Sequence, residues 1–405
     1  FTMNYANIQF DGDKIARVAG QIERQKKLKR DYIYPAKRVD MDDKGNLLLE
    51  GKTFNVGDRT YLDWNDAEAA ADEQALGSSQ IVVNDRKASL EMNRSAYVQL
   101  LNRLDIPTRF ADKVSGDKHA PEVRSMLVRE LLNRDDRKFL VRTLNGKVRA
   151  VLSDRYKILD NSDLFFQSAE KFKEVNAQMW QARLWNDGGG FEMFATAQHI
   201  AGEVKTDRTF DPGDGWQSRW YGTEGDVHNP AVRVSNSETG QGGCNANLSI
   251  LRRVCANFCV WTDGVSVIHA GGHISADDGL LMSDETRQKE NELVWLKVRD
   301  AIATAFDEGK FRAYIDRLND CTKDVIEEPI KVVDKLAGEY AISESRKSAI
   351  LTELLGSGDR SRYGLVQAIT EGADADGISD EESSMLNTIG GQLIESDQHY
   401  AALVG

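Results

Sequence analysis

Apolar residues recur at every third or fourth position in several stretches of the chain, a spacing typical of amphipathic helices. In residues 13–30, four apolar residues fall at roughly helical intervals among many cations: Ile15, Val18, Ile22 and Leu28. This pattern predicts a basic amphipathic helix, followed by a turn at residues 32–35. Further helices are expected at residues 95–104, 121–134 and 162–175, and through most of the chain after Ser283.

Residues 138–152 contain two strand-like runs joined by Asn145-Gly146, the dipeptide most typical of a two-residue hairpin turn. Simple pairing about a type I′ turn sets Arg142 opposite Arg149 and gives the hairpin two faces. The predicted core face carries Phe139, Val141, Thr143, Val148, Ala150 and Leu152. Like charges directly opposite one another repel, so either a nearby acid compensates the two arginines or they form an anion site.

A second strand pair is expected within residues 178–198, and shorter strands at 42–60, 80–83, 88–92, 231–234, 248–260 and 265–268. These elements predict an α+β fold with a central mixed or antiparallel sheet, β-hairpins and flanking helices, plus an α-helical C-terminal domain. We predict three domains: a basic N-terminal helical arm and linker at 1–55, an α+β core at 56–280, and an acidic helical domain at 281–405.

The formal net charge of −13 is unevenly distributed. From Asp277 to the end there are 27 acidic and 14 basic residues, whereas the residues before it hold 38 of each. Residues 13–38 and 124–157 form two basic zones. No apolar run is long enough to cross a membrane, the first residues lack a signal-peptide pattern, and four cysteines do not make a disulfide framework. We therefore expect a cytoplasmic protein.

The second basic zone suggests a nucleic-acid site. Five cations in it could contact successive phosphates: Arg142, Lys147, Arg149, Arg155 and Lys157. Arg155 and Lys157 alternate with Asp154 and Tyr156, so in an extended segment both cations project to one side. The alternative is that Asp154 pairs with Arg155 and that Tyr156 belongs to the core.

Single-stranded nucleic acid also needs flat side chains on which bases can stack. Tyr32 and Tyr34 lie among cations of the first basic zone. A glycine-bounded loop further along the chain contains Trp216, Arg219 and Trp220, which we predict to take part in nucleic-acid binding. The alternative is that these aromatic rings fold back over the core.

Metal and anion sites have weaker support. Five residues could ligate zinc, namely Cys244, Cys255, Cys259, His269 and His273, but no pair of CxxC knuckles is present, and buried thiols with a histidine turn fit equally well. The polar run 235–238 is followed by Gly240, Gly242 and Gly243, whose backbone amides could bind an anion or could simply complete a turn.

Catalytic motifs are absent from the sequence. It has no P-loop, no dinucleotide-binding fingerprint, no GxSxG and no HExxH. We predict no catalytic residue and no cofactor. Acidic pairs at Asp211/Asp214 and Asp277/Asp278 leave a metal-dependent nuclease as one alternative.

Several sequence blocks resemble one known family. They are KRDYIYPAKR, LDIPTRF, RTLNGKVRAVLSDRYKILDNSDLF, RVSNSETG, RRVCANF and RYGLVQAIT. In these blocks the chain is similar to the phage/plasmid-like family catalogued as "domain of unknown function 932", over residues 29–391. The resemblance implies an intracellular protein of a mobile element, often encoded near replication and recombination functions. It implies no established activity. Cys244 lies in a part that departs from the family pattern.

The function that we predict is a mobile-element nucleic-acid-binding protein, an oligomeric factor that binds or anneals single-stranded DNA or serves recombination. The alternatives are a protein-interaction module, such as a host-defence antagonist, and the nuclease. The arm at 13–30 would pack either on an acidic neighbouring subunit or on its own core.

Overall fold

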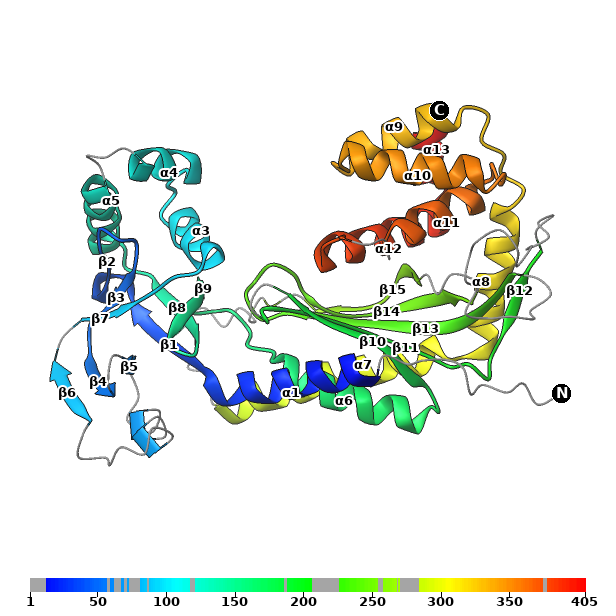
Figure 1. The fold of residues 1–405 in the computed structure, drawn as a ribbon. Coiled ribbons are helices and arrows are strands. Elements are labelled where there is room, and N and C mark those ends of the chain that lie inside the picture. Colours follow the sequence, from blue (N-terminus) through cyan, green and yellow to red (C-terminus); the bar gives the residue numbers. More distant parts are fainter. Residues whose placement is uncertain are drawn as a thin grey trace.

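The computed structural model describes residues 12–56, 59–61, 67–68, 71–72, 81–85, 87–116, 121–185, 188–205, 226–253, 258–267, 269, 284–373 and 377–405. It confirms the α+β fold, with antiparallel sheets and a helical C-terminal region. Figure 1 shows a smaller lobe and a larger lobe, which the chain joins twice. Among the described residues, no helix is both long and apolar enough to span a bilayer.

The described part of the smaller lobe contains three short sheets, a 3-10 helix at Ala36–Arg38 (η2) and several α-helices. One sheet has the order β1-β8-β9, formed by β1 (Lys29–Pro35), β8 (Lys138–Leu144) and β9 (Lys147–Ser153). The second sheet has the order β2-β3-β7, formed by β2 (Val39–Met41), β3 (Leu47–Leu49) and β7 (Ala88–Leu90). The third has the order β5-β4-β6, formed by β5 (Arg59–Tyr61), β4 (Lys52–Val56) and β6 (Val82–Asp85). The α-helices include α3 (Arg94–Arg103), α4 (Thr108–Gly116) and α5 (Pro121–Arg134).

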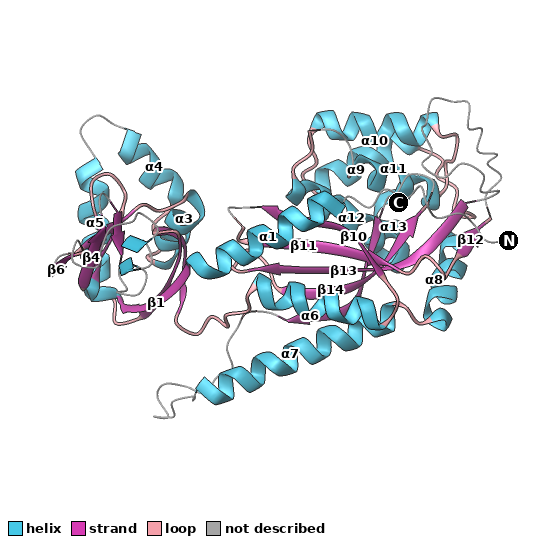
Figure 2. Cartoon of the chain, turned by 60° about the horizontal axis from the view of Figure 1, so that its bottom comes forward, coloured by secondary structure: helices cyan, strands magenta, loops and turns pink. Residues whose placement is uncertain are grey.

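The larger lobe is built on an antiparallel sheet. Its strands are β10 (Gln178–Trp185), β11 (Gly190–Thr196), β13 (Asp226–Ser237), β14 (Cys244–Arg252) and β15 (Phe258–Val267), with β12 (Gly202–Val204) paired to β13. One face is covered by α1 (Gly12–Leu28), α6 (Asn161–Glu174) and α7 (Asp284–Ala305), as Figures 1 and 2 show.

The first of the C-terminal helices runs along the end of this sheet beside β12, and the later ones lie on the side opposite to α1 (Figure 1). The C-terminal helices are α8 (Glu308–Cys321), α9 (Pro329–Glu339), α10 (Glu344–Gly356), α11 (Arg362–Gly372), α12 (Asp380–Glu395) and α13 (Asp397–Val404). The backbone of α12 lies directly against β15, because a Cβ atom on Gly391 would collide with the backbone oxygen of Val260. A close helix-to-strand contact of this kind requires glycine.

The apolar stripe of α1 packs on the chain's own core. Val18 and Ile22 are buried in the same hydrophobic cluster as Phe165 of α6 and Phe191 of β11. This is one of the two surfaces that the sequence left open for the arm. The helix ends at Leu28, and the next residues form β1 instead of the predicted turn, since Tyr32, Ile33 and Tyr34 pair with β8. Aromatic and β-branched residues favour such a half-buried strand.

The hydrophobic clusters group the chain differently from the three predicted domains. One cluster combines α1, the large sheet and C-terminal residues such as Val298, Leu365 and Leu393. A second cluster belongs to the smaller lobe and includes Leu47 and Leu100. The predicted arm at 1–55 thus contributes to both lobes, and the acidic region 281–405 shares its core with the sheet.

The predicted hairpin forms, but its register differs from the simple one. Asn145 and Gly146 have φ values of 51° and 77°, as a type I′ turn requires. Thr143 pairs with Val148 as expected, but Arg142 pairs with Ala150, because a β-bulge leaves Arg149 without a partner across the ladder. A bulge reverses the side-chain alternation beyond it. The prediction that Arg142 faces Arg149 across the ladder was therefore wrong.

Both faces of the hairpin are buried. Phe139, Val141, Val148 and Val151 pack in the smaller lobe's core. Leu140, Ala150 and Leu152 form a separate cluster with Tyr156 and Ile158 on the other face. Arg142 lies on this second, enclosed face. Its guanidinium is therefore buried and is not available at the surface.

Candidate functional site

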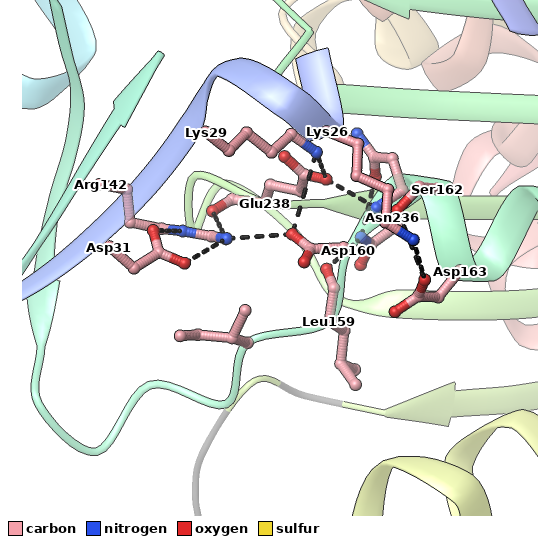
Figure 3. A network of polar contacts seen from close by, with 12 residues as sticks. Lys26, Lys29, Asp31, Arg142, Leu159, Asp160, Ser162, Asp163, Asn236 and Glu238 are labelled. Atoms are coloured by element: carbon pink, nitrogen blue, oxygen red, sulfur yellow. Dashed lines mark hydrogen bonds and ion pairs between the residues drawn. The ribbon is translucent and has the colours of Figure 1, made fainter. Parts of the chain in front are cut away.

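Three of the sequence blocks that carry the family resemblance meet where the two lobes join. They contribute β1, the β8–β9 hairpin with the segment leading into α6, and the end of β13. Six charged side chains converge there, and we name them the junction cluster: Lys29, Asp31, Arg142, Arg149, Asp160 and Glu238. Figure 3 labels Lys29, Asp31, Arg142, Asp160 and Glu238.

Glu238 lies at the centre of the junction cluster and is fully buried. Its carboxylate contacts the Lys29 ammonium and accepts a 2.6 Å hydrogen bond from Arg149 Nη1. The backbone N–H of Asn161 donates another, of 2.6 Å. Burial alone would raise the pKa of Glu238, but the charges of Arg149, Lys29 and Arg142 outweigh it and lower that pKa. The carboxylate is therefore held ionised.

Arg142 is enclosed on every side by acceptors. Its Nε and Nη2 donate to the two carboxylate oxygens of Asp31 at 2.8 and 3.0 Å. Nη2 also reaches Asp160 Oδ1 at 3.1 Å, and Nη1 donates to the backbone oxygen of Glu238 at 2.7 Å. The nearby carboxylates raise the pKa of Arg142 despite its burial. A bidentate pair of this geometry fixes the guanidinium in one orientation.

A layer of amides and rings borders the junction cluster. Asn236 Nδ2 donates to the backbone oxygen of Leu159 at 2.8 Å and to Asn161 Oδ1 at 2.9 Å. His269 lies with Nδ1 2.8 Å from the Lys157 oxygen and Nε2 3.0 Å from Asn236 Oδ1. Burial lowers the pKa of His269, and its neutral ring can donate to only one of these two oxygens. Tyr156 stacks on this ring at 4.7 Å.

The predicted five-cation track does not form a continuous surface. Arg142 and Arg149 are only 0% and 2% exposed and pair with buried carboxylates. Lys157 is mostly buried and lies 3.6 Å from Glu290. Lys147 and Arg155 are exposed, but they lie at opposite ends of β9.

Local structure explains this outcome. The segment around Arg155 is a turn after β9 and not an extended run, so its cations do not project to one side. Lys147 pairs with Glu91 at 2.7 Å in an exposed contact. The predicted aromatic loop, with Trp216, Arg219 and Trp220, lies outside the described residues.

The zinc hypothesis gains no support from the residues that the structure describes. Burial raises the pKa of Cys244 to about 12 and that of Cys259 well above its ordinary value, so both thiols stay protonated. A thiol must be deprotonated to ligate zinc. No group of three or more possible metal ligands occurs in the described part of the chain. Cys255, His273 and the acidic pairs proposed for a nuclease lie outside it.

A second buried polar cluster lies where β13 begins and β14 ends. Arg252 binds the carboxylate of Asp226 through Nε at 2.8 Å and Nη2 at 2.7 Å. Tyr363 of α11 donates its hydroxyl to Asp226 Oδ2 at 2.5 Å, and the Tyr363 hydroxyl oxygen lies 3.2 Å from His228 Nε2. His228 Nδ1 faces the Asp226 backbone oxygen at 3.0 Å and must carry the proton, since a carbonyl only accepts. These side chains are buried, so they hold the C-terminal helices to the sheet.

Sequence reasoning missed most members of both clusters. Arg142 is separated by 111 residues from Asp31 and by 96 from Glu238, and Tyr363 by 137 residues from Asp226. No local spacing marks such pairs. The one usable indication was the placement of arginines within the apolar runs of β8 and β14, because a buried arginine needs a carboxylate partner.

Several exposed cations lie on α1. Arg17, Arg24 and Lys27 are exposed and have no carboxylate partner among the described residues; we name them the α1 cation row. Arg17 and Arg24 are seven residues apart and so share one side of the helix. The hairpin tip adjoins the end of α1, since Asn145 N–H donates to the Leu28 oxygen at 3.1 Å. Exposed Lys147 is therefore near the end of the row.

No family model, curated protein or solved structure matches the chain. The resemblance to the phage/plasmid-like family therefore stays a prediction, and the candidate function rests on the geometry of the residues described above.

Proposed function

We propose that this protein binds nucleic acid, with single-stranded DNA as the expected ligand, through the α1 cation row and the adjoining hairpin tip. The observation that carries the proposal is the set of three exposed cations without carboxylate partners on one helix. An exposed cation that is paired with a carboxylate must give up that pair to bind a phosphate, so it gains less binding free energy. An unpaired cation gives up only water and counterions.

The helix that presents these cations is firmly held. Its buried stripe packs in the core, and its C-terminus is linked to the hairpin through Leu28. Arg30 donates to the backbone oxygens of Lys27 and Lys29 at 2.8 and 2.6 Å, which satisfies carbonyls at the helix end. The row is therefore presented on a rigid support, which lowers the entropic cost of binding.

Aromatic side chains follow the α1 cation row along the chain. Arg30, Tyr32 and Tyr34 alternate on β1 and so share one face of this edge strand. Both tyrosines are half-buried, with ring centroids 6.5 Å apart. A cation row followed by partly exposed rings is the combination that sequence-tolerant binding of single strands uses.

The junction cluster has a supporting role in this proposal. It contains three basic and three acidic side chains and is largely buried, so it contributes little field at the surface. Its position between β1, the hairpin and β13 fixes the lobe that carries the tyrosines relative to the helix that carries the cations.

The test is the salt dependence of binding to oligothymidylate, measured by fluorescence anisotropy. Each phosphate contact contributes about −0.7 to the log–log slope for single strands. Replacing Arg17, Arg24 and Lys27 by Gln should therefore make the slope less steep by about 2 and weaken binding at low salt.

A matched control removes the same charge elsewhere. Lys289, Arg312 and Lys331 are exposed and lie in short-range ion pairs on α7, α8 and α9, respectively. Their triple Gln variant should bind as the wild type does. Equal loss in both triple variants would show a nonspecific charge effect, and no binding by the wild type would favour the protein-interaction alternative.

The mobile-element origin and the oligomeric state belong to the same proposal. Annealing or recombination would require several subunits along one strand, and the packing of α1 on its own core leaves that helix's cations outward in each subunit. Light scattering of the full chain with and without oligothymidylate tests assembly directly.

A further inference from the structure

Arg149 is the one member of the junction cluster whose guanidinium is only partly used by the described residues. Its side chain is 2% exposed, and Nη1 donates to Glu238 Oε2 at 2.6 Å. Its Nε and Nη2 are buried, and neither meets a hydrogen-bond acceptor among the described residues. A buried charged donor without a partner is costly, so its retention calls for a reason.

The neighbouring Arg142 shows what this edge of a guanidinium binds. In Arg142, Nε and Nη2 together hold the two oxygens of Asp31 at 2.8 and 3.0 Å. In Arg149, Nε and Nη2 form the same two-donor fork, but neither atom meets a hydrogen-bond acceptor among the described residues. Such a fork is matched to a group with two adjacent anionic oxygens, which describes a carboxylate or a phosphate.

A second buried side-chain donor belongs to Thr239, which follows Glu238 in the chain. The hydroxyl of Thr239 is buried and also has no partner among the described residues. Gln99 connects Thr239 to the hairpin, because its Nε2 donates to the Thr239 oxygen at 2.6 Å and its Oε1 accepts from Val151 N at 3.0 Å. Val151 is two residues from Arg149 on β9.

The loop that joins β13 to β14 covers this region and is rich in glycine. Gly240 has a φ of 76°, and a Cβ there would lie 2.7 Å from Leu152 Cδ2, so its backbone packs directly on the hairpin. Gln241 and Gly242 are exposed on the outer side of the same loop. The loop that carries Glu238 and Thr239 therefore contacts the hairpin on one side and reaches the surface on the other.

We infer that Arg149 and Thr239, beneath the loop at 238–243, form a binding site for a phosphoryl group. The fork would take two phosphate oxygens, and the threonine hydroxyl would donate to the ligand. Phosphate is favoured over carboxylate because the loop's glycines can turn backbone N–H groups toward a tetrahedral anion. The source is either free phosphate or the 5′ end of a nucleic acid, which share this chemistry.

The test is thermal unfolding of the full chain in inorganic phosphate, against chloride at equal ionic strength. A ligand that binds the folded state raises the melting temperature progressively with its concentration. Arg149→Lys keeps the charge facing Glu238 but lacks the fork, and it should lose the phosphate-specific rise. Oligothymidylate with and without a 5′ phosphate, added in chloride buffer, distinguishes the two sources.

Thr239→Val keeps the inference testable where the lysine variant fails to fold. Without phosphate this variant should be as stable as the wild type or more so, because an unpartnered buried hydroxyl is removed. Its affinity for phosphate should nevertheless fall about tenfold, as expected for a lost hydrogen bond to an anion. Thr370→Val, a buried threonine whose hydroxyl bonds within α11, is the control and should leave phosphate affinity unchanged.

Two results would overturn the inference: a wild type that responds to phosphate no more than to chloride, or a response in both Arg149→Lys and Thr239→Val that equals the response of the wild type. The inference does not depend on the proposed function. The triple Gln variant of the α1 cation row should keep its full response to inorganic phosphate, so failure of one proposal is distinguishable from failure of the other.

Discussion

The buried imidazole of His228 makes a quantitative prediction about stability against pH. Burial, together with the charge of Arg252, lowers its pKa from 6.5 to about 4, although Asp226 acts in the opposite direction. Because the unfolded chain binds the proton more tightly, stability falls as the pH drops from 6.5 towards 4. At about 1.4 kcal/mol per pKa unit, the full effect is about 3 kcal/mol.

About 2 kcal/mol of this effect should already be lost between pH 7.5 and pH 5.0, where the unfolded histidine is largely protonated and the folded one is not. His228→Asn removes the titration while keeping an amide donor near the Asp226 oxygen. We therefore expect the variant to be less stable than the wild type at pH 7.5, and the difference to shrink by about 2 kcal/mol at pH 5.0.

Urea unfolding at both pH values, followed by tryptophan fluorescence, measures the change. Other groups titrate in this range too, so the informative quantity is the difference between variant and wild type at each pH. His399→Gln, an exposed histidine, is the control and should track the wild type. A constant difference between His228→Asn and the wild type across the two pH values would refute the reasoning.

Two further predictions concern the junction cluster and the contact of α12. Glu238→Gln removes the carboxylate that the buried cations Lys29 and Arg149 share and should cost about 3–5 kcal/mol in urea unfolding, whereas Glu130→Gln, in an exposed pair with Arg134, should cost less than about 1 kcal/mol. Similar losses in the two variants would contradict the assigned role of Glu238. Gly391→Ala should lower the melting temperature because its Cβ meets β15, while Gly338→Ala, a helical glycine with open space around it, should raise stability by up to about 1 kcal/mol. An unchanged melting temperature in Gly391→Ala would show that α12 does not approach β15 as closely as described.

Local patterns were enough to predict the elements. The helical spacing of Val18 and Ile22 located α1, and Asn145-Gly146 located the hairpin turn, because both depend only on neighbours in the chain. The α+β class followed from these elements. The bulge at Arg149 was not predicted: β8 also pairs with β1 and β9 also packs against α3, and a local pattern contains neither contact.

The candidate site was harder to predict for the same reason. Cations at Arg142 and Arg149 suggested a surface for phosphates, yet their partners Asp31 and Glu238 come from distant segments and enclose them. A sequence pattern shows which side chains carry charge. It does not show which of those charges the fold neutralises, and here that decided which cations remain at the surface.

The order of the elements has a consequence for how the chain folds during synthesis. Residues 29–153 form an insertion between α1 and α6, both of which belong to the larger lobe. The inserted lobe has its own core and can fold as soon as β9 has emerged from the ribosome. The apolar stripe of α1 has no complete packing surface until α6 and the large sheet follow, more than a hundred residues later. Helix α1 is thus made well before the surface that buries it, and a nascent chain must shield its apolar stripe meanwhile.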